Sequence, residues 1–366
     1  MSKTHRVTCI IGTRPEVLKM APVILALEAQ ENIQVDTIVT GQHREMLDQM
    51  LTHFNINVTA DFNIMTENQQ LSQLTARLLE LLADYLKTCP SDLIIAQGDT
   101  TTTMTAALSA FYHHIPFMHV EAGLRTDNVN MPFPEELNRR ITSQIASIHC
   151  CPTELAKENL LKEGIAEHVH MTGNTIIDTL YRFTKGITIP KNDKKIILVT
   201  CHRRENFGKP MENICTALKE IIQHHLDVEI VLPVHPNPNV KQIIYHHLQN
   251  VDRIHLTEHL DYEALTTLLA KSYLVITDSG GLQEEAPALG KPVLVLREQT
   301  ERPEGIACGA AKIVGTDPKK ITEAVNILLT DPKAYQQMST AGSPYGDGNA
   351  SERIAKIVTD YLITVQ

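Results

Sequence analysis

Three carboxylic side chains, those of Asp99, Glu121 and Glu135, lie within a short part of the sequence and could take part in acid–base chemistry. Asp99 is followed by a run of four threonines, Glu121 stands in HVEAGLR and Glu135 in PFPEE. An acid of this kind, taken singly, is more often a helix cap or a solvated loop residue. Three acids that converge on one edge of a sheet would instead form a site that can remove and deliver protons.

The segments around these acids predict how they are brought together. Residues 93–97 and 116–120 are short, apolar runs typical of strands, and the pattern between them, over 101–113, is helical. A strand, a helix and a second strand in this order form a unit whose two strands are parallel. Since parallel strands end at the same edge of a sheet, where open α/β folds bind ligands, we expect Asp99 and Glu121 to meet there.

A second group of residues could hold a phosphate. Ser279, Gly280 and Gly281 follow a predicted strand over 273–277 and lead into a helical pattern over 282–289. Two glycines at such a turn let backbone N–H groups approach an anion at the positive end of a helix. A plain tight turn is the alternative interpretation.

The first strand-to-helix turn offers two cations. A buried-strand pattern over 7–11 is followed by a helical one up to residue 30, and Arg14 and Lys19 stand at the beginning of that helix. The turn lacks the GxGxxG pattern, which gives little support to dinucleotide binding of that kind. A helix N-terminus with an arginine and a lysine suits a diphosphate, and a solvated helix start is the alternative.

Composition limits the classes of protein that fit. The chain has 366 residues, so two domains are expected, and its formal net charge of −10 argues against nucleic acid or an anionic membrane as a partner. We find no signal-peptide pattern and no apolar run that would span a bilayer. The seven cysteines are an odd number without CxxC spacing, which disfavours a disulfide framework and a zinc ribbon. A cytoplasmic protein is predicted.

The order of the elements predicts an α/β fold with two Rossmann-like, doubly wound domains that face each other across a cleft. We place the N-terminal domain, with the acids, at residues 1–172 and the phosphate-binding C-terminal domain at 173–350. The connection between the two domains includes the apolar-poor segment 183–195. A final helix in 351–366 is expected to pack back on the N-terminal domain.

Ten sequence blocks in this order resemble the non-hydrolysing UDP-N-acetylglucosamine 2-epimerases over essentially the full length. They are GTRPEVLKMAP, GQHREML, QGDTTTT, HVEAGLRT, PFPEELNR, TGN, VTCHRREN, PVHPNPNV, TDSGGLQEEAPALGKPVLVLREQTERPEG and YGDG. The resemblance implies a GT-B-like fold, a homodimer, and interconversion of UDP-GlcNAc and UDP-ManNAc without a redox or metal cofactor. In that family the C2 proton and UDP leave to give 2-acetamidoglucal, and both add back with the opposite configuration at C2.

The resemblance also implies roles for individual residues. The catalytic residues it implies are Asp99, Glu121, Glu135 and His202. Those that bind the substrate are Arg14, Lys19, Ser279, Gly280, Gly281, Glu285 and Arg302. Bacterial members carry a second, activating UDP-GlcNAc site, and the matching positions are Gln42, His43, Gln69, Arg203 and His235. Near the uracil the family often has an aromatic residue, whereas this chain has Leu265, with Tyr262 close by.

Three alternative functions are left. A hydrolysing relative would release free ManNAc and UDP, and its members typically lack the proline and lysine pattern of Gly12 to Lys19. A glycosyltransferase of the same fold would use the nucleotide site with an acceptor, and would not need three acids. A sensor without catalytic activity would bind UDP-GlcNAc but would not exchange the C2 proton with solvent.

Overall fold

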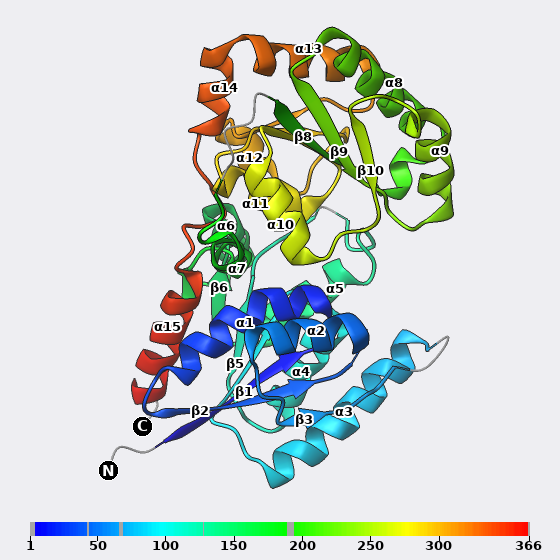
Figure 1. Ribbon diagram of the computed structural model, residues 1–366. Helices are drawn as coiled ribbons and strands as arrows, with labels where there is room; N and C mark the ends of the chain where they lie inside the picture. The colour runs from blue at the N-terminus through cyan, green and yellow to red at the C-terminus, as the bar shows by residue number, and fades with distance from the viewer. Residues whose placement is uncertain (1–3, 42–43, 66–68, 127, 189–193, 365–366) are drawn as a thin grey trace. The chain divides into compact units, whose positions relative to one another are not determined.

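The computed structural model describes residues 4–41, 44–65, 69–126, 128–188 and 194–364. The chain divides into two compact units (Figure 1). Unit 1 comprises Met1–Thr179 and Tyr345–Gln366, and unit 2 comprises Leu180–Pro344. These divisions differ from the predicted ends at 172 and 350, because helix α7 (Thr175–Thr184) runs through the first of them.

Among its described residues, unit 1 forms a seven-stranded parallel sheet with the order β3-β2-β1-β4-β5-β6-β7. The strands are β1 (His5–Ile11), β2 (Ile33–Val39), β3 (Ala60–Asp61), β4 (Leu93–Gln97), β5 (Phe117–Val120), β6 (Ile148–Cys151) and β7 (Val169–Met171). The helices between them are α1 (Arg14–Glu28), α2 (Arg44–Phe54), α3 (Leu71–Thr88), α4 (Thr101–Tyr112), α5 (Glu135–Ile145) and α6 (Glu154–Lys162).

The sequence explains these elements through their apolar spacing. Strand β4 is apolar up to Gln97 and buried throughout, as expected for a central strand of a parallel sheet. Helix α3 buries Leu74, Leu78, Leu82 and Leu86, which recur every four residues and therefore lie on one face. One stripe of α3 thus packs inward.

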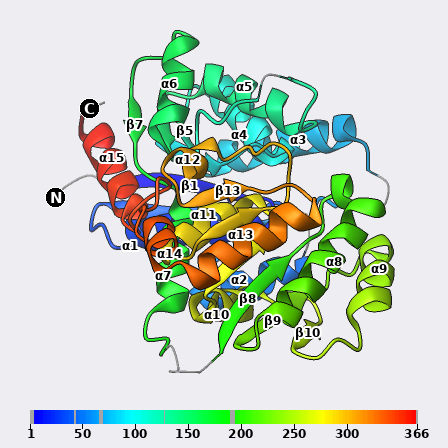
Figure 2. The same ribbon diagram turned by 90° about the horizontal axis from the view of Figure 1, so that it is seen from above.

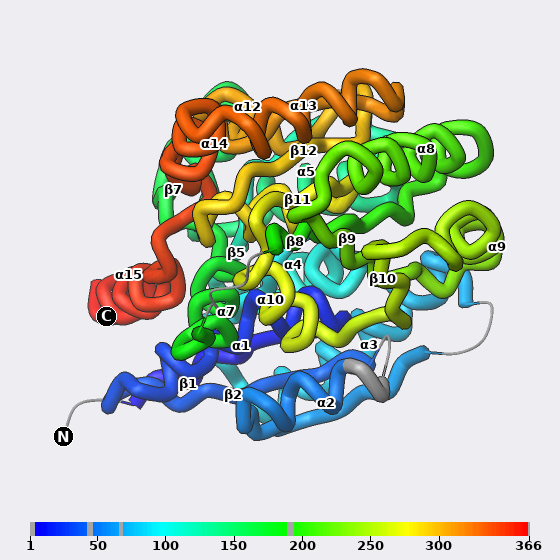
Figure 3. Tube along the Cα trace, turned by 45° about the horizontal axis from the view of Figure 1, so that its top comes forward, coloured from blue at the N-terminus to red at the C-terminus, as the bar shows by residue number. Residues whose placement is uncertain are grey.

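Unit 2 forms a six-stranded parallel sheet among its described residues, with the order β10-β9-β8-β11-β12-β13. Figure 3 labels β10, β9, β8, β11 and β12 of this sheet. The strands are β8 (Lys195–Thr200), β9 (Val228–Pro233), β10 (Ile254–Thr257), β11 (Leu274–Thr277), β12 (Val293–Val295) and β13 (Ala311–Ile313). The helices are a 3₁₀ turn (Arg204–Asn206), α8 (Lys209–His224), α9 (Pro238–Leu248), α10 (Tyr262–Lys271), α11 (Gly280–Ala288), α12 (Pro303–Ala307), α13 (Pro318–Thr330) and α14 (Pro332–Ser339).

Both faces of the unit 2 sheet are covered by helices. Ile197 and Val199 of β8 belong to a buried cluster with side chains of α8, α9 and α13, which pack in a row (Figure 2). Leu198 lies between them in the sequence and belongs to a second cluster, with side chains of α10 and α11. Successive side chains of a strand point to opposite faces, so this alternation places one helical layer on each face.

The last helix, α15 (Ala350–Thr364), belongs to unit 1 and packs against α1 (Figure 1). Asp178 of α7 accepts hydrogen bonds from the backbone N–H groups of Ala350 at 3.2 Å and Ser351 at 2.7 Å, and from the Ser351 hydroxyl at 2.5 Å. This carboxylate therefore satisfies the first N–H groups of α15, which have no partner within the helix.

Both strand orders reverse beside the first strand of the unit, the arrangement of a Rossmann-like fold. The predicted α/β class with two doubly wound domains is confirmed. The predicted cleft between the domains stays a prediction. None of the helices in the described ranges is long and apolar enough to cross a membrane.

Candidate active site

The acids of unit 1 lie where its strand order reverses. Strands β1 and β4 are neighbours, and the chain continues from β1 toward β3 but from β4 toward β7. In open α/β sheets, such a reversal leaves a crevice at the carboxyl ends of the strands. Asp99 follows β4 and Glu121 follows β5, so both lie at this edge, as the sequence predicted.

Glu121 is held by three donors. Lys19 Nζ lies 2.5 Å from Oε1, Asn174 Nδ2 donates to the same oxygen at 2.9 Å, and Gln97 donates to Oε2. The backbone of Glu121 has φ of 64°, a left-handed conformation that is uncommon for a residue with a side chain and that occurs often at functional sites. Lys19 therefore belongs to the acid cluster in this structure.

Asp99 pairs with an arginine that the sequence analysis did not select. Arg139 Nη2, on α5, lies 2.6 Å from Asp99 Oδ2, and Asn138 donates to the Asp99 carbonyl at 2.9 Å. Burial raises the pKa of Asp99, the Arg139 charge opposes that rise, and the negative charges of Glu121 and Glu135 add to it. The three predicted acids are thus close enough to influence one another.

Glu135 and Glu136 are adjacent but differ in environment. Glu136 is fully buried, lies 2.7 Å from Arg140 Nε, and accepts the Thr126 N–H at 3.1 Å. Glu135 is the first residue of α5 and is partly exposed. Of the two, Glu135 is the one that can reach a ligand.

His119 supports the loop that carries Asp99 and was missed by the sequence analysis. Its side chain is fully buried, and Nε2 lies 2.7 Å from the carbonyl oxygen of Gly98. Burial lowers the pKa of His119 to about 3, so the ring is neutral at ordinary pH and Nε2 carries the proton. The residue thus fixes the backbone immediately before Asp99.

The N-terminus of α1 differs from what the sequence suggested. Oε2 of the buried Glu16 accepts the N–H groups of Gly12 at 2.5 Å and Thr13 at 2.7 Å, and Oε1 accepts the Thr100 hydroxyl at 2.6 Å. These two N–H groups are therefore already bound by the protein's own carboxylate, and diphosphate binding by Arg14 and Lys19 stays a prediction. Arg14, the first residue of α1, is partly exposed.

The β1–α1 turn also approaches α4 closely at Gly12. A Cβ on Gly12 would lie 2.5 Å from the Thr102 hydroxyl oxygen, so only glycine fits between the β1–α1 turn and α4. Glu16 and Gly12 together therefore hold the β1–α1 turn against the loop that contains Asp99.

Unit 2 places its candidate residues at an equivalent reversal, between β8 and β11. His202 follows β8 and Asp278 follows β11, and the two strands are paired in parallel. Oδ2 of the buried Asp278 accepts the N–H groups of His202 at 2.8 Å and Arg203 at 2.9 Å, and Asn206 Nδ2 at 2.9 Å. Its Oδ1 lies 3.2 Å from His202 Nδ1.

The turn Ser279-Gly280-Gly281 forms the N-terminus of α11, as predicted. Ser279 is the N-cap residue, and its side chain makes no capping hydrogen bond. The guanidinium of Arg203 lies beside the turn, with Nη2 3.7 Å from the position a Cβ on Gly280 would take. Unlike α1, this helix therefore offers an anion both backbone N–H groups and a nearby arginine.

The other predicted binding residues of unit 2 lie on and around α11. Glu285 Oε1 accepts the hydroxyl of the buried Tyr262 at 2.6 Å, and Arg302 pairs with Glu284. The Tyr262 ring packs edge-on against Phe183, with centroids 5.1 Å apart. Tyr262 thus holds Glu285 and is not exposed for stacking on a base, while Leu265 is partly buried in the adjoining apolar cluster.

The residues predicted to form the activating site are distributed over both units. Gln42 and His43 lie outside the described residues. Gln69 precedes α3 in unit 1, and its Oε1 is buried without a hydrogen-bond partner among the described atoms. Arg203 and His235 are in unit 2, where the His235 ring stacks on His202 with centroids 5.5 Å apart and an interplanar angle of 17°.

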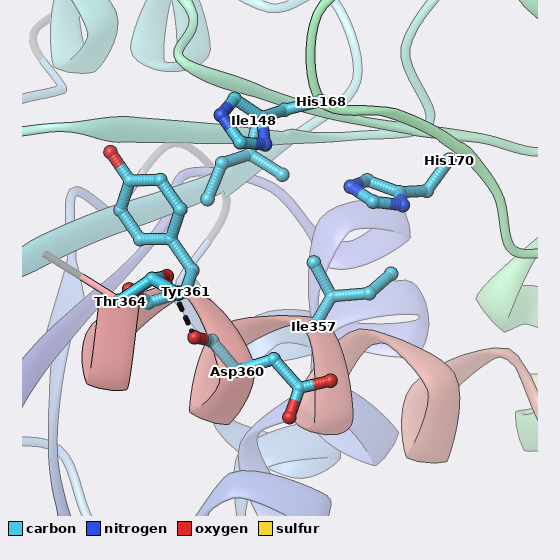
Figure 4. A pocket seen from close by; sticks show the side chains of 7 residues that line it. All are labelled: Ile148, His168, His170, Ile357, Asp360, Tyr361 and Thr364. Carbon is cyan, nitrogen blue, oxygen red and sulfur yellow. Dashed lines mark hydrogen bonds between the residues drawn. The ribbon is translucent and has the colours of Figure 1, made fainter.

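A separate pocket in unit 1, of about 190 Å³, lies between β6, β7 and α15 (Figure 4). Ile148 is the first residue of β6 and His168 immediately precedes β7, so this pocket is near the amino ends of the strands. The close-up shows the His168 ring near Tyr361, with centroids 5.7 Å apart. None of the predicted site residues lines it.

Within the described ranges, no group of three or more His, Cys, Asp and Glu side chains could hold a metal ion. The chemistry that the described site residues themselves offer is that of carboxylates, histidine and cations.

Comparisons with known proteins agree with these features. The two doubly wound units place the chain in the class of GT-B-like, two-domain α/β proteins. The sequence profile of the UDP-N-acetylglucosamine 2-epimerase family matches residues 25–359. The chain belongs to this family.

Individual relatives cover nearly the whole chain. The UDP-N-acetylglucosamine 2-epimerase of Bacillus subtilis is 49% identical over 97% of this chain and 95% of its own length. The structure of UDP-GlcNAc 2-epimerase from Neisseria meningitidis bound to UDP-GlcNAc has a TM-score of 0.86 at 43% identity, covering 98% of this chain and 100% of that one. A glycosyltransferase of kitacinnamycin, with a TM-score of 0.67 at 12% identity, covers 99% of this chain and 100% of that one and shares the fold alone.

Proposed function

We propose that this chain, a member of the UDP-GlcNAc 2-epimerase family, interconverts UDP-GlcNAc and UDP-ManNAc without hydrolysing the UDP linkage. The observation that carries the proposal is the group of Asp99, Glu121 and Glu135 at one sheet edge, with Lys19 and Arg139 bound to two of them. A glycosyltransferase, which only transfers the sugar from UDP, would not need three interacting acids.

The acids supply the proton chemistry. A proton on a saturated sugar carbon is very weakly acidic, so its removal requires a positioned carboxylate and must be coupled to loss of UDP. In the proposed reaction a carboxylate takes the C2 proton, the C–H electron pair forms the C1–C2 double bond of 2-acetamidoglucal, and the C1–O electron pair leaves with UDP. Re-addition reverses these steps with the proton delivered to the opposite face, which requires two proton carriers.

The residues of unit 2 bind the nucleotide end in this proposal. Ser279, Gly280 and Gly281 at the N-terminus of α11 hold the diphosphate, with Arg302 contributing charge. The N–H groups of Gly280 and Gly281 donate to it, because the Ser279 N–H already donates to Thr277 Oγ1 at 2.9 Å. Glu285, oriented by Tyr262, accepts the ribose hydroxyls. His202 donates a proton or a hydrogen bond to the β-phosphate oxygen as negative charge develops on it.

The environment of Arg14 and Lys19 bears on the alternatives. The GTRPEVLK block is the pattern that hydrolysing relatives typically lack, and here its Lys19 pairs with Glu121 at 2.5 Å. Through this contact the block holds one of the acids that are proposed to move the C2 proton, which favours the non-hydrolysing reaction. A glycosyltransferase has no need of such a pair.

Incubation of the purified protein with UDP-GlcNAc in D2O, followed by NMR, tests the proposal. We expect deuterium at C2 in a mixture of UDP-GlcNAc and UDP-ManNAc with the UDP linkage intact. Free ManNAc and UDP as the products would identify a hydrolysing enzyme. Turnover that requires an added acceptor would identify a glycosyltransferase, and binding without exchange at C2 would identify a sensor.

We also propose activation by UDP-GlcNAc at a second site that includes Gln42, His43, Gln69, Arg203 and His235. The stacking of His235 on His202 supports this activation, because a ligand that contacts one ring would change the environment of the other. With UDP-ManNAc alone the reaction should start with a lag, which a small amount of UDP-GlcNAc should abolish. Full initial rates without UDP-GlcNAc would disprove activation.

The assembly and location belong to the same proposal. We infer a cytoplasmic homodimer. An odd number of cysteines, seven, supports a reducing compartment. Light scattering of the purified chain at several concentrations measures the oligomeric state.

A further inference from the structure

The ends of four neighbouring strands in unit 2 contribute one ionisable side chain each to a single row. His259, His235, His202 and Asp278 follow β10, β9, β8 and β11, which are adjacent in the sheet in this order. The His235 ring stacks on His202 at 5.5 Å and meets His259 edge-on at 6.2 Å. At the other end of the row, Asp278 faces His202.

Asp278 determines which nitrogen of His202 carries a proton. The carboxylate is fully buried, and its Oδ2 accepts three N–H donors, so it is the ionised, acceptor-only form. Burial works to raise the pKa of Asp278, but His202 and the backbone N–H groups of His202 and Arg203 hold it below its ordinary value. Oδ1 is buried without a hydrogen-bond partner among the described atoms and lies 3.2 Å from His202 Nδ1, so its negative charge favours a proton on that nitrogen.

His235 shows the opposite arrangement. The backbone N–H of Asn237 donates to His235 Nδ1 at 3.2 Å, so that nitrogen has no proton and the neutral ring carries its proton on Nε2. Burial, followed by the charges of His202 and His259, lowers the pKa of His235. When both stacked rings are neutral, His202 therefore carries its proton on Nδ1 and His235 carries its proton on Nε2. Asp278 fixes the first arrangement and the Asn237 N–H fixes the second.

We propose that Asp278 is a positioning residue that keeps the His202 proton on Nδ1, so that Nε2 is the nitrogen that exchanges a proton with the departing diphosphate. This inference rests on the proposed epimerase function and deepens it. The His202 side chain is 37% exposed, whereas Asp278 is not exposed at all, so His202 Nε2 can reach a ligand while Nδ1 stays bound. Arg203, beside His202, brings positive charge to the same ligand.

One proton and one electron pair move in this step. As the C1–O bond breaks, its electron pair goes to the β-phosphate oxygen, and the proton on Nε2 of the imidazolium form of His202 moves to that oxygen. His202 is left neutral with its proton on Nδ1, still bound to Asp278. When UDP adds back, the oxygen attacks C1 and its proton returns to Nε2.

The replacement Asp278→Asn tests the role of the carboxylate. The asparagine oxygen can still accept the N–H groups of His202 and Arg203, but its NH₂ group then faces His202 Nδ1 and forces that nitrogen to accept. The neutral ring must move its proton to Nε2, which removes the lone pair that takes the proton back. We expect kcat to fall by about 10²-fold or more, with KM within about threefold of the parent value.

Asp317→Asn is the matched control. Asp317 is in the same unit and caps α13 by accepting the Lys319 N–H at 2.9 Å, a role that asparagine also fills. Its kcat should be unchanged. If Asp278→Asn keeps its parent kcat, or loses activity only through KM, the proposal is wrong.

Nitrogen-15 NMR of the full-length, histidine-labelled protein tests the inference without substrate. The His202 and His235 signals are identified as those lost in His202→Gln and His235→Gln. At a pH where both rings are neutral, we expect the proton on Nδ1 of His202 and on Nε2 of His235, with the His202 proton moving to Nε2 in Asp278→Asn. A neutral wild-type His202 that carries its proton on Nε2 would overturn the proposal, even if Asp278→Asn does not fold.

The two failures are distinguishable. Absence of epimerisation by the parent chain in D2O would refute the proposed function. A parent chain that epimerises while His202 carries its proton on Nε2 would refute only the role of Asp278.

Discussion

Asp99 shows how two opposing effects set the state of one carboxyl group. Burial favours its neutral form, and the Arg139 guanidinium 2.6 Å away favours the ionised form. Glu121, by contrast, has a lysine and two amides on its oxygens. The two acids of one cluster thus lie in different environments, as acid and base roles in proton transfer require.

Neutral replacements of the three acids should each abolish most of the activity. Asp99→Asn, Glu121→Gln and Glu135→Gln keep the side-chain size but lose the proton carrier, so turnover should fall by about 10²-fold or more. Deuterium incorporation at C2 measures the loss, and circular dichroism checks the fold. Glu154→Gln, an exposed change at the start of α6, is the control. Unchanged rates in all three variants would remove the assignment.

Arg139→Met should change the pH dependence of the reaction. The Arg139 charge lowers the pKa of Asp99, so its removal raises that pKa further. Activity that requires ionised Asp99 is lost as pH falls through this pKa, and the acid limb of the kcat profile should therefore move up by about one pH unit or more. Arg140 is the residue after Arg139 and forms an ion pair with Glu136. Arg140→Met removes that pair and should leave the acid limb in place. If the acid limb does not move in Arg139→Met, the ionisation of Asp99 does not control kcat.

At the scale of elements, the two strand-to-helix turns that carry a phosphate prediction differ through one side chain. In α1 the third helical residue is Glu16, and its carboxylate folds back on the turn. In α11 the residue after Gly281 is Leu282, and the N-cap serine makes no capping bond. Both helices have a positive end, but only α11 leaves that end to a ligand.

Glu16→Gln should destabilise unit 1. The glutamine oxygen can still accept the Gly12 and Thr13 N–H groups, and its NH₂ group then donates to the Thr100 hydroxyl, which must turn from donor to acceptor. Bonds to a charged carboxylate are replaced by weaker neutral ones, at a cost of about 1 kcal/mol. Urea unfolding followed by circular dichroism measures the change, with Glu31→Gln, at an exposed turn, as the control. A variant as stable as the control would show that the buried carboxylate does not contribute to stability.

The elements were predictable to the extent that their apolar spacing is local. The runs ending at Gln97, Val120 and Thr277 identified strand ends, so Asp99, Glu121 and Ser279 were found from the sequence. Contacts between distant positions were not. The Asp278–His202 contact joins residues 76 positions apart, and the Arg139–Asp99 pair joins residues 40 apart, so neither has a periodic signal. The capping box of Thr13 and Glu16 is a local signal, and reading it would have corrected the α1 prediction.

At the scale of the whole molecule, each unit carries one half of the chemistry. Unit 1 holds the acids and has its α1 N-terminus filled by Glu16, whereas unit 2 has the open helix end of α11. In the proposed function, binding of the nucleotide and binding of the sugar are therefore separable events. A ligand without a sugar should act on unit 2 first.

Hydrogen exchange with two ligands tests this separation. UDP alone should slow exchange in 202–206 and 279–285, because bound phosphates protect the N–H groups of these turns. Segments 97–101 and 119–125 of unit 1 should slow only when UDP-GlcNAc is present. The α9–β10 connection, 249–253, should not respond to either ligand. Protection of unit 1 alone by UDP would contradict the assignment of the phosphates to α11.

The anchoring of α15 by Asp178 has a consequence for synthesis. Unit 1 is made of the first and last parts of the chain, and all of unit 2 lies between them. A ribosome therefore completes unit 2 before it releases the helix that covers α1. Until then the face of α1 that packs against α15 is exposed, and the cell must protect it through the whole translation of the intervening domain.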